Sequence, residues 1–212
     1  LQDVRDNDPY YDQRNAKNEQ IIQNWINNNY NSFQSKKAVI TIPTVVQLWV
    51  NSSTVSDARV QEQIDVLNED YRRTNADASN TPSWFQNVAA DCEIEFCLAQ
   101  QDPNGNASTG ITRTSTSTSS FNGTGSVKSS SSGGKDPWPR NDYLNIWVCP
   151  LSGGLLGYAL FPGGPASTDG VVIGYNYFGD MGTVSSPFNK GRTATHEVGH
   201  WLSLYHSFEN GC

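Results

Sequence analysis

The chain has 212 residues and a formal net charge of -7, with 36% hydrophobic and 17% charged residues. This length is enough to bury a substantial core, and a single domain with at most an appendage is the natural expectation. The acidic balance, without a Lys/Arg cluster, argues against nucleic acid as a partner, and the apolar runs are too short to span a bilayer.

The first predicted element is an amphipathic helix from about Pro9 to Tyr30. Its apolar residues recur at i, i+1, i+4 and i+5 in a polar background: Ile21, Ile22, Trp25 and Ile26. This spacing indicates one apolar face that packs against the main domain. We therefore separate an N-terminal helical segment, residues 1–37, from the rest of the chain. Both the tail of a pro-region and an ordinary N-terminal helix agree with this pattern.

A βαβ unit is predicted next. Residues 38–50 are rich in β-branched side chains and indicate a buried strand, with Pro43 near its start or at a bulge. Ser56 is a suitable N-cap for a helix that extends to about Arg73, and residues 93–99 indicate a second strand. The two strands should be parallel and joined by a right-handed crossover.

Residues 102–142 are rich in Ser, Thr and Gly, a composition typical of a linker. A disordered loop of about 40 residues is unusual inside a compact domain. Because Phe121, Val127 and Trp138 could anchor this segment, we predict an ordered excursion over the surface. A free Ser/Thr-rich stalk at residues 108–135 is the alternative.

The last part of the chain predicts three strands and a helix. The strands cover residues 144–149, 155–160 and 170–177, and the helix covers Lys190–Leu202. A tight turn at residues 152–154 joins the first two of these strands, so they should be antiparallel or diverge sharply.

The three histidines of the protein all lie in this helix or directly after it: His196, His200 and His206. His196 and His200 are at i and i+4, so both imidazoles project from one helix face, with Glu197 beside them. Neutral imidazole is a good zinc ligand, and three protein ligands leave a fourth position for water. The pattern therefore predicts a hydrolytic zinc site in which Glu197 takes the proton of that water.

The sequence resembles the metzincin zinc peptidases and, within them, the pappalysins. The signature HExxHxxGxxH corresponds to His196, Glu197, His200 and His206. Further stretches are similar to bacterial secreted pappalysins: QIDVLNEDYRRTNAD, EIEFCLA, YLNIWV, GGLLGYALFPGG, DGVVI and NKGRTATHEVGHWL. The resemblance implies an α/β (α+β) upper subdomain. Such a subdomain has a twisted, five-stranded, mostly parallel sheet with one antiparallel edge strand, a backing helix and an active-site helix.

The resemblance also implies a function. It indicates a secreted zinc-dependent endopeptidase that acts on proteins or peptides, with Glu197 activating a zinc-bound water. In this family an extended substrate pairs with the edge strand, and the matching residues here are Leu155, Leu156, Gly157, Tyr158 and Ala159. Calcium is suggested by the resemblance alone, without residues to assign to it. A non-catalytic or weakly active peptide-binding fragment is the alternative function.

The sequence departs from the family pattern at two places. Ser203 replaces the family Gly at the helix end, where the turn commonly needs a positive φ that costs a non-Gly residue about 1 kcal/mol. The chain also stops at Cys212, before the methionine-containing turn of metzincins, and its only methionine, Met181, precedes the histidines. We therefore expect residues 38–212 to be the N-terminal subdomain of a catalytic domain, truncated after the zinc motif.

The four cysteines leave the disulfide pattern open: Cys92, Cys97, Cys149 and Cys212. They agree with an exported protein that contains disulfides and equally with buried thiols. On an extended segment Cys92 and Cys97 would lie about 16 Å apart, beyond disulfide reach. The low Lys content, the Asn/Thr/Ser-rich surface and the zinc motif favour secretion.

Overall fold

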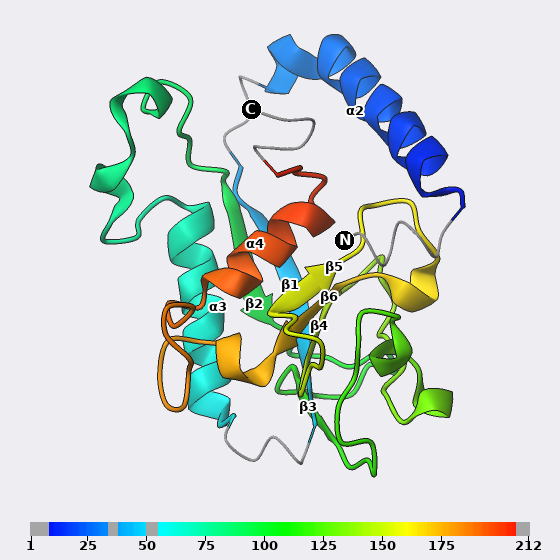
Figure 1. The fold of residues 1–212 in the computed structure, drawn as a ribbon. Helices are drawn as coiled ribbons and strands as arrows, with labels where there is room; N and C mark the ends of the chain where they lie inside the picture. Colours follow the sequence, from blue (N-terminus) through cyan, green and yellow to red (C-terminus); the bar gives the residue numbers. More distant parts are fainter. Residues whose placement is uncertain (1–8, 34–37, 50–54, 207–212) are drawn as a thin grey trace.

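The computed structural model describes residues 9–33, 38–49 and 55–206. Its helices and strands are, in chain order, α2 (Tyr11–Phe33), β1 (Ile40–Trp49), α3 (Asp57–Tyr71), β2 (Ile94–Leu98), β3 (Ile111–Thr114), β4 (Leu144–Cys149), β5 (Gly157–Ala159), β6 (Val171–Gly174) and α4 (Arg192–Trp201) (Figure 1). Among the described residues, no helix combines the length and apolar character needed to cross a membrane.

The strands form one mixed sheet in the order β2-β1-β4-β6-β5. All pairs are parallel except β5 with β6. This confirms the predicted α/β fold with an antiparallel edge strand. The sheet has six strands because β3 pairs with the second half of β1, past the point where β2 ends. β2 and β3 therefore lie end to end along one side of β1, and the sheet is five strand positions wide.

The predicted βαβ unit is present in β1, α3 and β2. The Ser56 side chain caps α3 by accepting a hydrogen bond of 3.2 Å from the backbone N–H of Arg59. Pro43 lies near the start of β1, and pairing of β1 with β4 begins only at Thr44. The missing N–H of Pro43 is therefore tolerated, because β1 is paired on one side only at this position.

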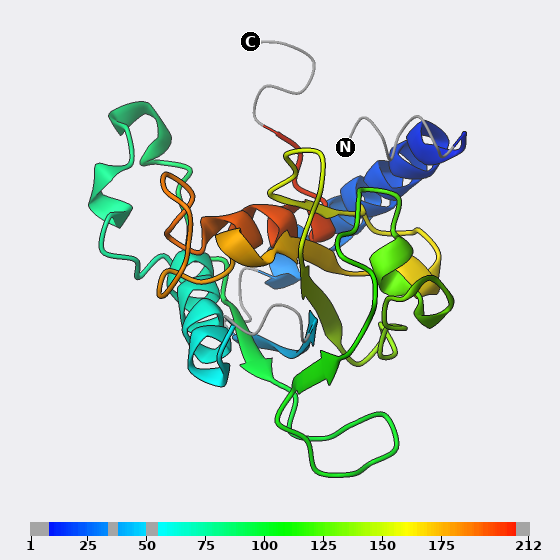
Figure 2. The same ribbon diagram turned by 60° about the horizontal axis from the view of Figure 1, so that its bottom comes forward.

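The two faces of the sheet carry separate hydrophobic clusters. Helices α3 and α4 cover one face, where their apolar residues pack on alternate residues of the central strands (Figure 1). On the other face, Phe121 and Val127 of the predicted excursion pack against Trp49, Trp147 and Val172. Figure 2 shows this excursion, in green, folded beside the sheet. It is an anchored part of the domain, unlike the free stalk considered as the alternative.

Polar contacts fix the position of α4 against its neighbours. The Thr195 hydroxyl donates a 2.8 Å hydrogen bond to Asp70, and the Tyr71 hydroxyl donates to the Thr195 carbonyl at 3.1 Å. At the other end of the helix, the Trp201 indole N–H donates to Asp169 at 2.9 Å. Because both ends are attached, the rotation of α4 about its axis is determined, and with it the direction of the residues on its outer face.

Helix α2 lies outside the two layers and contacts the segment that follows β5 (Figure 1). The Tyr11 ring meets the Phe161 ring edge-on at 6.3 Å, and the Asn18 amide donates to the Pro162 carbonyl. The apolar face expected to pack on the main domain is instead largely exposed, at Ile21, Trp25 and Ile26. The more buried positions form a different stripe, at spacings of four, three and four: Tyr11, Asn15, Asn18 and Ile22. The contacts with Phe161 and Pro162 determine which face of α2 is buried.

Candidate active site

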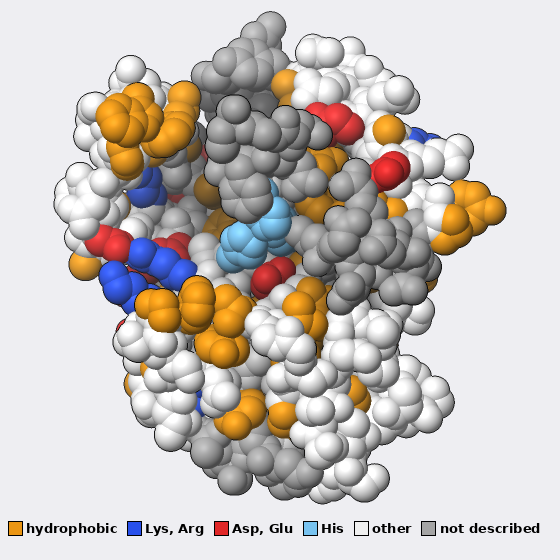
Figure 3. Space-filling view, in the orientation of Figure 1, with side chains coloured by type: hydrophobic (Ala, Val, Ile, Leu, Met, Phe, Trp, Pro, Cys, Tyr) orange, Lys and Arg blue, Asp and Glu red, His pale blue; other side chains and the backbone are white. Residues whose placement is uncertain are grey.

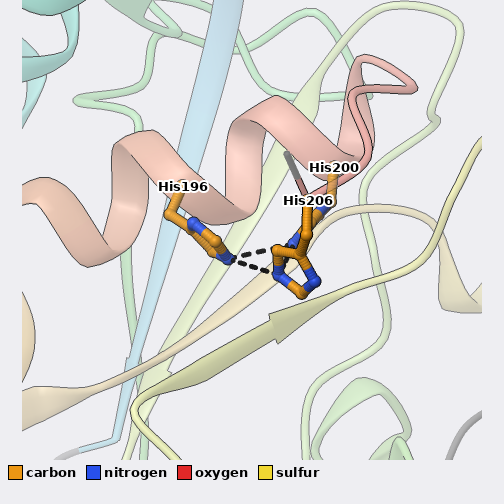
Figure 4. Close-up of side chains that lie close together, drawn as sticks. All are labelled: His196, His200 and His206. Carbon is orange, nitrogen blue, oxygen red and sulfur yellow. Dashed lines mark hydrogen bonds between the residues drawn. The ribbon is translucent and has the colours of Figure 1, made fainter. Parts of the chain in front are cut away.

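Three imidazole rings converge at the outer face of α4. His196 and His200 project from the helix, and His206 reaches the same point from the segment that follows it (Figure 4). The Nε2 atom of His200 lies 3.0 Å from both other Nε2 atoms, and those of His196 and His206 are 3.1 Å apart. The structure thus brings together the three histidines that the motif indicated.

The chain reverses after α4 through a left-handed residue. Ser203 has φ +76°, as expected if it replaces Gly in this turn. The N–H of Ser203 donates to the His200 carbonyl and that of Leu204 to the Gly199 carbonyl, both at 2.9 Å. This pair of bonds is the Schellman motif, which ends a helix at once. His206 can therefore turn back to the helix face instead of continuing along the axis.

The hydrogen bonds of the rings suit a metal ion. His200 Nδ1–H donates to the Leu204 carbonyl at 2.8 Å, which leaves a lone pair on its Nε2. Three Nε2 atoms at mutual hydrogen-bond distance cannot all bond to one another, because a neutral imidazole carries one N–H only. Tetrahedral zinc–imidazole bonds of about 2.0–2.1 Å place their nitrogens roughly 3.3 Å apart, close to the observed triangle. The donor set therefore fits zinc.

The surroundings of His196 favour its neutral form. Burial lowers the pKa of His196, and the adjacent His200 and His206 lower this pKa further. Neutral imidazole is the form that binds a metal. The site is therefore already suited to a cation before one is bound.

Glu197 follows His196 on α4 and is 7% exposed. Burial raises the pKa of its carboxyl to about 7, and the charge of Lys128 partly opposes this shift. A carboxyl group with a pKa near neutrality can both accept and release a proton under physiological conditions. In Figure 3 the histidines, in pale blue, reach the surface with an acidic side chain close by.

A hollow of about 510 Å³ lies between the start of β5 and α4. Leu155, Leu156 and Gly157 line one side, and His196 and Glu197 line the other. A second hollow, of about 470 Å³, opens beside His200 and His206. The triad therefore stands between two recesses, an arrangement suited to a chain that passes over it.

The expected substrate-contacting stretch divides into two parts. Leu155, Leu156 and Gly157 reach the first hollow, whereas the side chains of Tyr158 and Ala159 are buried. Neither of these two side chains can contact a peptide. Of their backbones only that of Ala159 can, because the backbone groups of Tyr158 face β6. The Leu156 carbonyl accepts from the Gly174 N–H, so the backbone groups of Leu156 face β6 and, by alternation, those of Gly157 face the open side.

Several residues of the site gave no sequence signal. Phe161 stacks on Tyr205 with ring centroids 4.8 Å apart and lies 5.5 Å from the His200 ring. Pro187 and Phe188 close the first hollow opposite β5. These residues come from irregular segments, and only the folded chain brings them to the helix.

The structure also describes three of the cysteines. Cys92 and Cys97 are exposed and Cys149 is buried, and all three are free thiols. Cys212 lies outside the described residues. The disulfide considered for these positions is therefore not formed among Cys92, Cys97 and Cys149.

Comparison with known proteins places the chain in a family. Residues 128–212 match the peptidase M43 family model, described as pregnancy-associated plasma protein-A. An extracellular metalloprotease of Pyricularia oryzae is 30% identical over 192 residues, which cover 84% of this chain and 54% of that protein. The chain thus spans about half the length of the curated relatives it matches.

Solved structures agree in fold. Mature mirolysin of Tannerella forsythia in complex with a cleaved peptide superimposes with a TM-score of 0.77 at 54% identity, over 81% of this chain and 66% of that one. A promirolysin mutant of the same organism superimposes with a TM-score of 0.79 at 46% identity, over 96% of this chain and 70% of that one. Together with the histidine triad, these matches show that the chain belongs to the pappalysin family of metalloproteases, the peptidase M43 family.

Proposed function

We propose that this chain carries the metal centre and one rim of the peptide cleft of a secreted zinc-dependent endopeptidase. The observation that carries the proposal is the convergence of three Nε2 atoms within 3.1 Å beside the buried carboxyl of Glu197. Export is supported by relatives named extracellular metalloproteases. Calcium, suggested only by family resemblance, stays a prediction.

Each residue of the site has a proposed role. His196, His200 and His206 hold zinc, which when bound polarises the scissile carbonyl and acidifies a water. Glu197 accepts the proton of that water on its carboxylate and later delivers it to the leaving amine. Its burial, which raises the pKa to about 7, suits both transfers. The Leu204 carbonyl holds the His200 ring in the tautomer that presents Nε2.

The edge strand is the proposed contact for the substrate backbone. Among the described strands, β5 pairs with β6 only, so its other edge is free to pair with an extended peptide. The buried side chains of Tyr158 and Ala159 cannot select substrate residues, so we expect this rim to accept many sequences. The peptide complex of mature mirolysin supports a peptide or protein as substrate.

Residues 1–37 are proposed to be a pro-segment, and residues 38–212 to be catalytic-domain sequence. The match to promirolysin covers 96% of the chain, whereas the match to mature mirolysin covers 81%. The difference is about the size of this segment. Helix α2 also contacts Phe161, whose ring lies beside His200. Among the described residues, helix α2 therefore reaches the metal centre indirectly, through the Phe161 ring.

The proposal is tested by metal analysis and peptide cleavage. We expect about one zinc per chain in the unmodified protein, in Glu197→Ala and in Glu69→Ala, an exposed control on α3. Cleavage should fall by roughly 10²–10⁴-fold in Glu197→Ala only. Bound zinc with cleavage independent of Glu197 would contradict the proposed mechanism. Bound zinc and bound peptide without any cleavage would support the alternative, a peptide-binding fragment.

A further inference from the structure

Lys128 is a fully buried lysine on the sheet face opposite α4. It ends a short 3-10 helix, Ser126–Lys128, and is 2% exposed. Its Nζ donates to the carbonyls of Thr168 and Gly170, at 2.6 and 3.0 Å. The same atom lies 5.1 Å from the centre of the Trp147 ring and 5.5 Å from that of Tyr158. A lysine is seldom buried without a specific set of partners.

Apart from Trp147, which lies on the central strand β4, these partners lie at or next to the rim of the cleft. Thr168 and Gly170 directly precede β6, and Tyr158 is the middle residue of β5. β5 and β6 are paired over three residue pairs only, from Gly157 with Ile173 to Ala159 with Val171. Because this pairing is so short, the position of β5 depends largely on the packing of its side chains. Lys128 supplies that packing from behind the strand and binds the start of β6 with the same ammonium group.

On the opposite face of β5, the Glu197 side chain packs against the strand. A Cβ atom on residue 157 would lie 3.0 Å from the Glu197 Cγ, so the strand and α4 are in close contact. β5 is therefore held between Glu197 on one face and Lys128, through the Tyr158 ring, on the other. A shift of the strand away from Glu197 would move its open edge relative to the histidines.

We propose that Lys128 is a positioning residue for substrate. It holds β5 in the position at which a peptide paired to the open edge of β5 contacts His196 and Glu197. This inference rests on the proposed function. Replacing Lys128 by Met keeps an unbranched side chain but leaves the Thr168 and Gly170 carbonyls without a donor. The residues before β6 and the Tyr158 ring would both lose their contact with Nζ, so β5 would no longer be supported on the face opposite α4.

The test compares two probes on the zinc-loaded protein in the Glu197→Gln background, which slows cleavage and keeps the side chain that lies against Gly157. One probe is an extended peptide, which pairs with β5, and the other is acetohydroxamic acid, a metal ligand too small to reach β5. Lys128→Met should weaken binding of the peptide about tenfold, equivalent to one backbone hydrogen bond, and leave that of the hydroxamate unchanged. Lys135→Met, in the same excursion, is the matched control and should change neither affinity.

In the cleavage-competent protein, Lys128→Met should lower kcat/KM for the peptide, through a higher KM and a lower kcat, because the peptide is bound less tightly and is displaced from Glu197. Tyr158→Leu removes the ring under Nζ and keeps the carbonyl contacts, so it should give the same selective loss even if Lys128→Met does not fold. Equal losses for both probes, or unchanged peptide affinity, would overturn the inference. If the unmodified protein binds the peptide but never cleaves it, the proposed function fails and the affinity comparison still decides the role of Lys128.

Discussion

A Cβ atom placed on Gly157 would lie 3.0 Å from the Glu197 Cγ and 2.8 Å from the Val172 carbonyl oxygen. At Gly157 the strand β5 and the helix α4 are in close contact. The backbone conformation of this residue does not require glycine, since its φ is not positive. Residue 157 therefore lacks a side chain for reasons of space alone, because it lies between the Glu197 side chain and β6.

Gly157→Ala should impair catalysis without removing the metal. The added methyl must displace Glu197 or push β5 off β6, and a misplacement of about 1 Å can cost 10²-fold in rate. Cleavage rate and zinc content should be measured together, with Gly164→Ala as control because a Cβ there meets nothing within 4 Å. Full activity of Gly157→Ala would show that the two elements are not tightly coupled.

Ser203→Gly should stabilise the turn that follows α4. Ser203 holds φ +76°, a conformation that glycine adopts without steric cost. We expect the free energy of unfolding to rise by up to about 1 kcal/mol, measured by urea denaturation. Ser203→Ala keeps the strain and should give no gain. A gain of the same size in the alanine variant would locate the effect in the hydroxyl group.

Zinc should stabilise the folded protein by mass action. Free zinc at about 100 times its dissociation constant adds roughly 2.7 kcal/mol, so thermal unfolding should move upward by several degrees and return after chelation. His206→Ala should reduce this shift, because the triangle of Nε2 atoms loses one corner. An equal shift in His206→Ala would exclude His206 as a ligand.

Acid should weaken the attachment of α4 near its first turn. Hydrogen bonds from Arg192 and Asn75 hold the pKa of Asp77 well below its usual range. A carboxylate with a lowered folded-state pKa stabilises the fold above its unfolded pKa of about 3.9, and this contribution is lost as pH falls through the folded value. Asp77→Asn should therefore destabilise the protein at pH 7 and progressively less below about pH 4. Urea midpoints across this range, compared with Asp142→Asn, provide the measurement.

The attachment of α2 can be tested by limited proteolysis. Asn18→Ala removes the donor to the Pro162 carbonyl, and Tyr11→Ala removes the ring that meets Phe161. Either change should accelerate cleavage within residues 11–33 several-fold, whereas Gln23→Ala, at an exposed position, should not. If α2 covers part of the cleft, peptide hydrolysis should rise in the same two variants. Unchanged proteolysis would mean that neither contact holds the helix.

The parts that sequence could predict are those with local signals. The i, i+4 spacing places His196 and His200 on one face of any helix, and the Ser203 turn brings His206 back because a Gly-like position ends that helix. Strands rich in β-branched residues were placed to within a few residues of their observed ends. The residues that carry these signals are adjacent in the chain, so no knowledge of packing is needed to find them.

The parts that sequence did not predict depend on distant contacts. β3 is four residues in a polar excursion and is a strand because β1 offers an unpaired edge past the end of β2. The exposed Trp25 on α2 follows from anchor points on Phe161 and Pro162 that no helical periodicity contains. Lys128 reads as a surface charge in a Ser-rich segment, and only the fold places it behind the cleft.

The strand order has a consequence for how the protein is made on the ribosome. β5 emerges before β6, yet β6 lies between β4 and β5 in the finished sheet. During synthesis β5 therefore has no strand to pair with until residues 171–174 have left the exit tunnel. Helix α4, which lines the other side of the first hollow, follows β6 in the chain, so a nascent chain cannot form this hollow until His196 and Glu197 have also emerged.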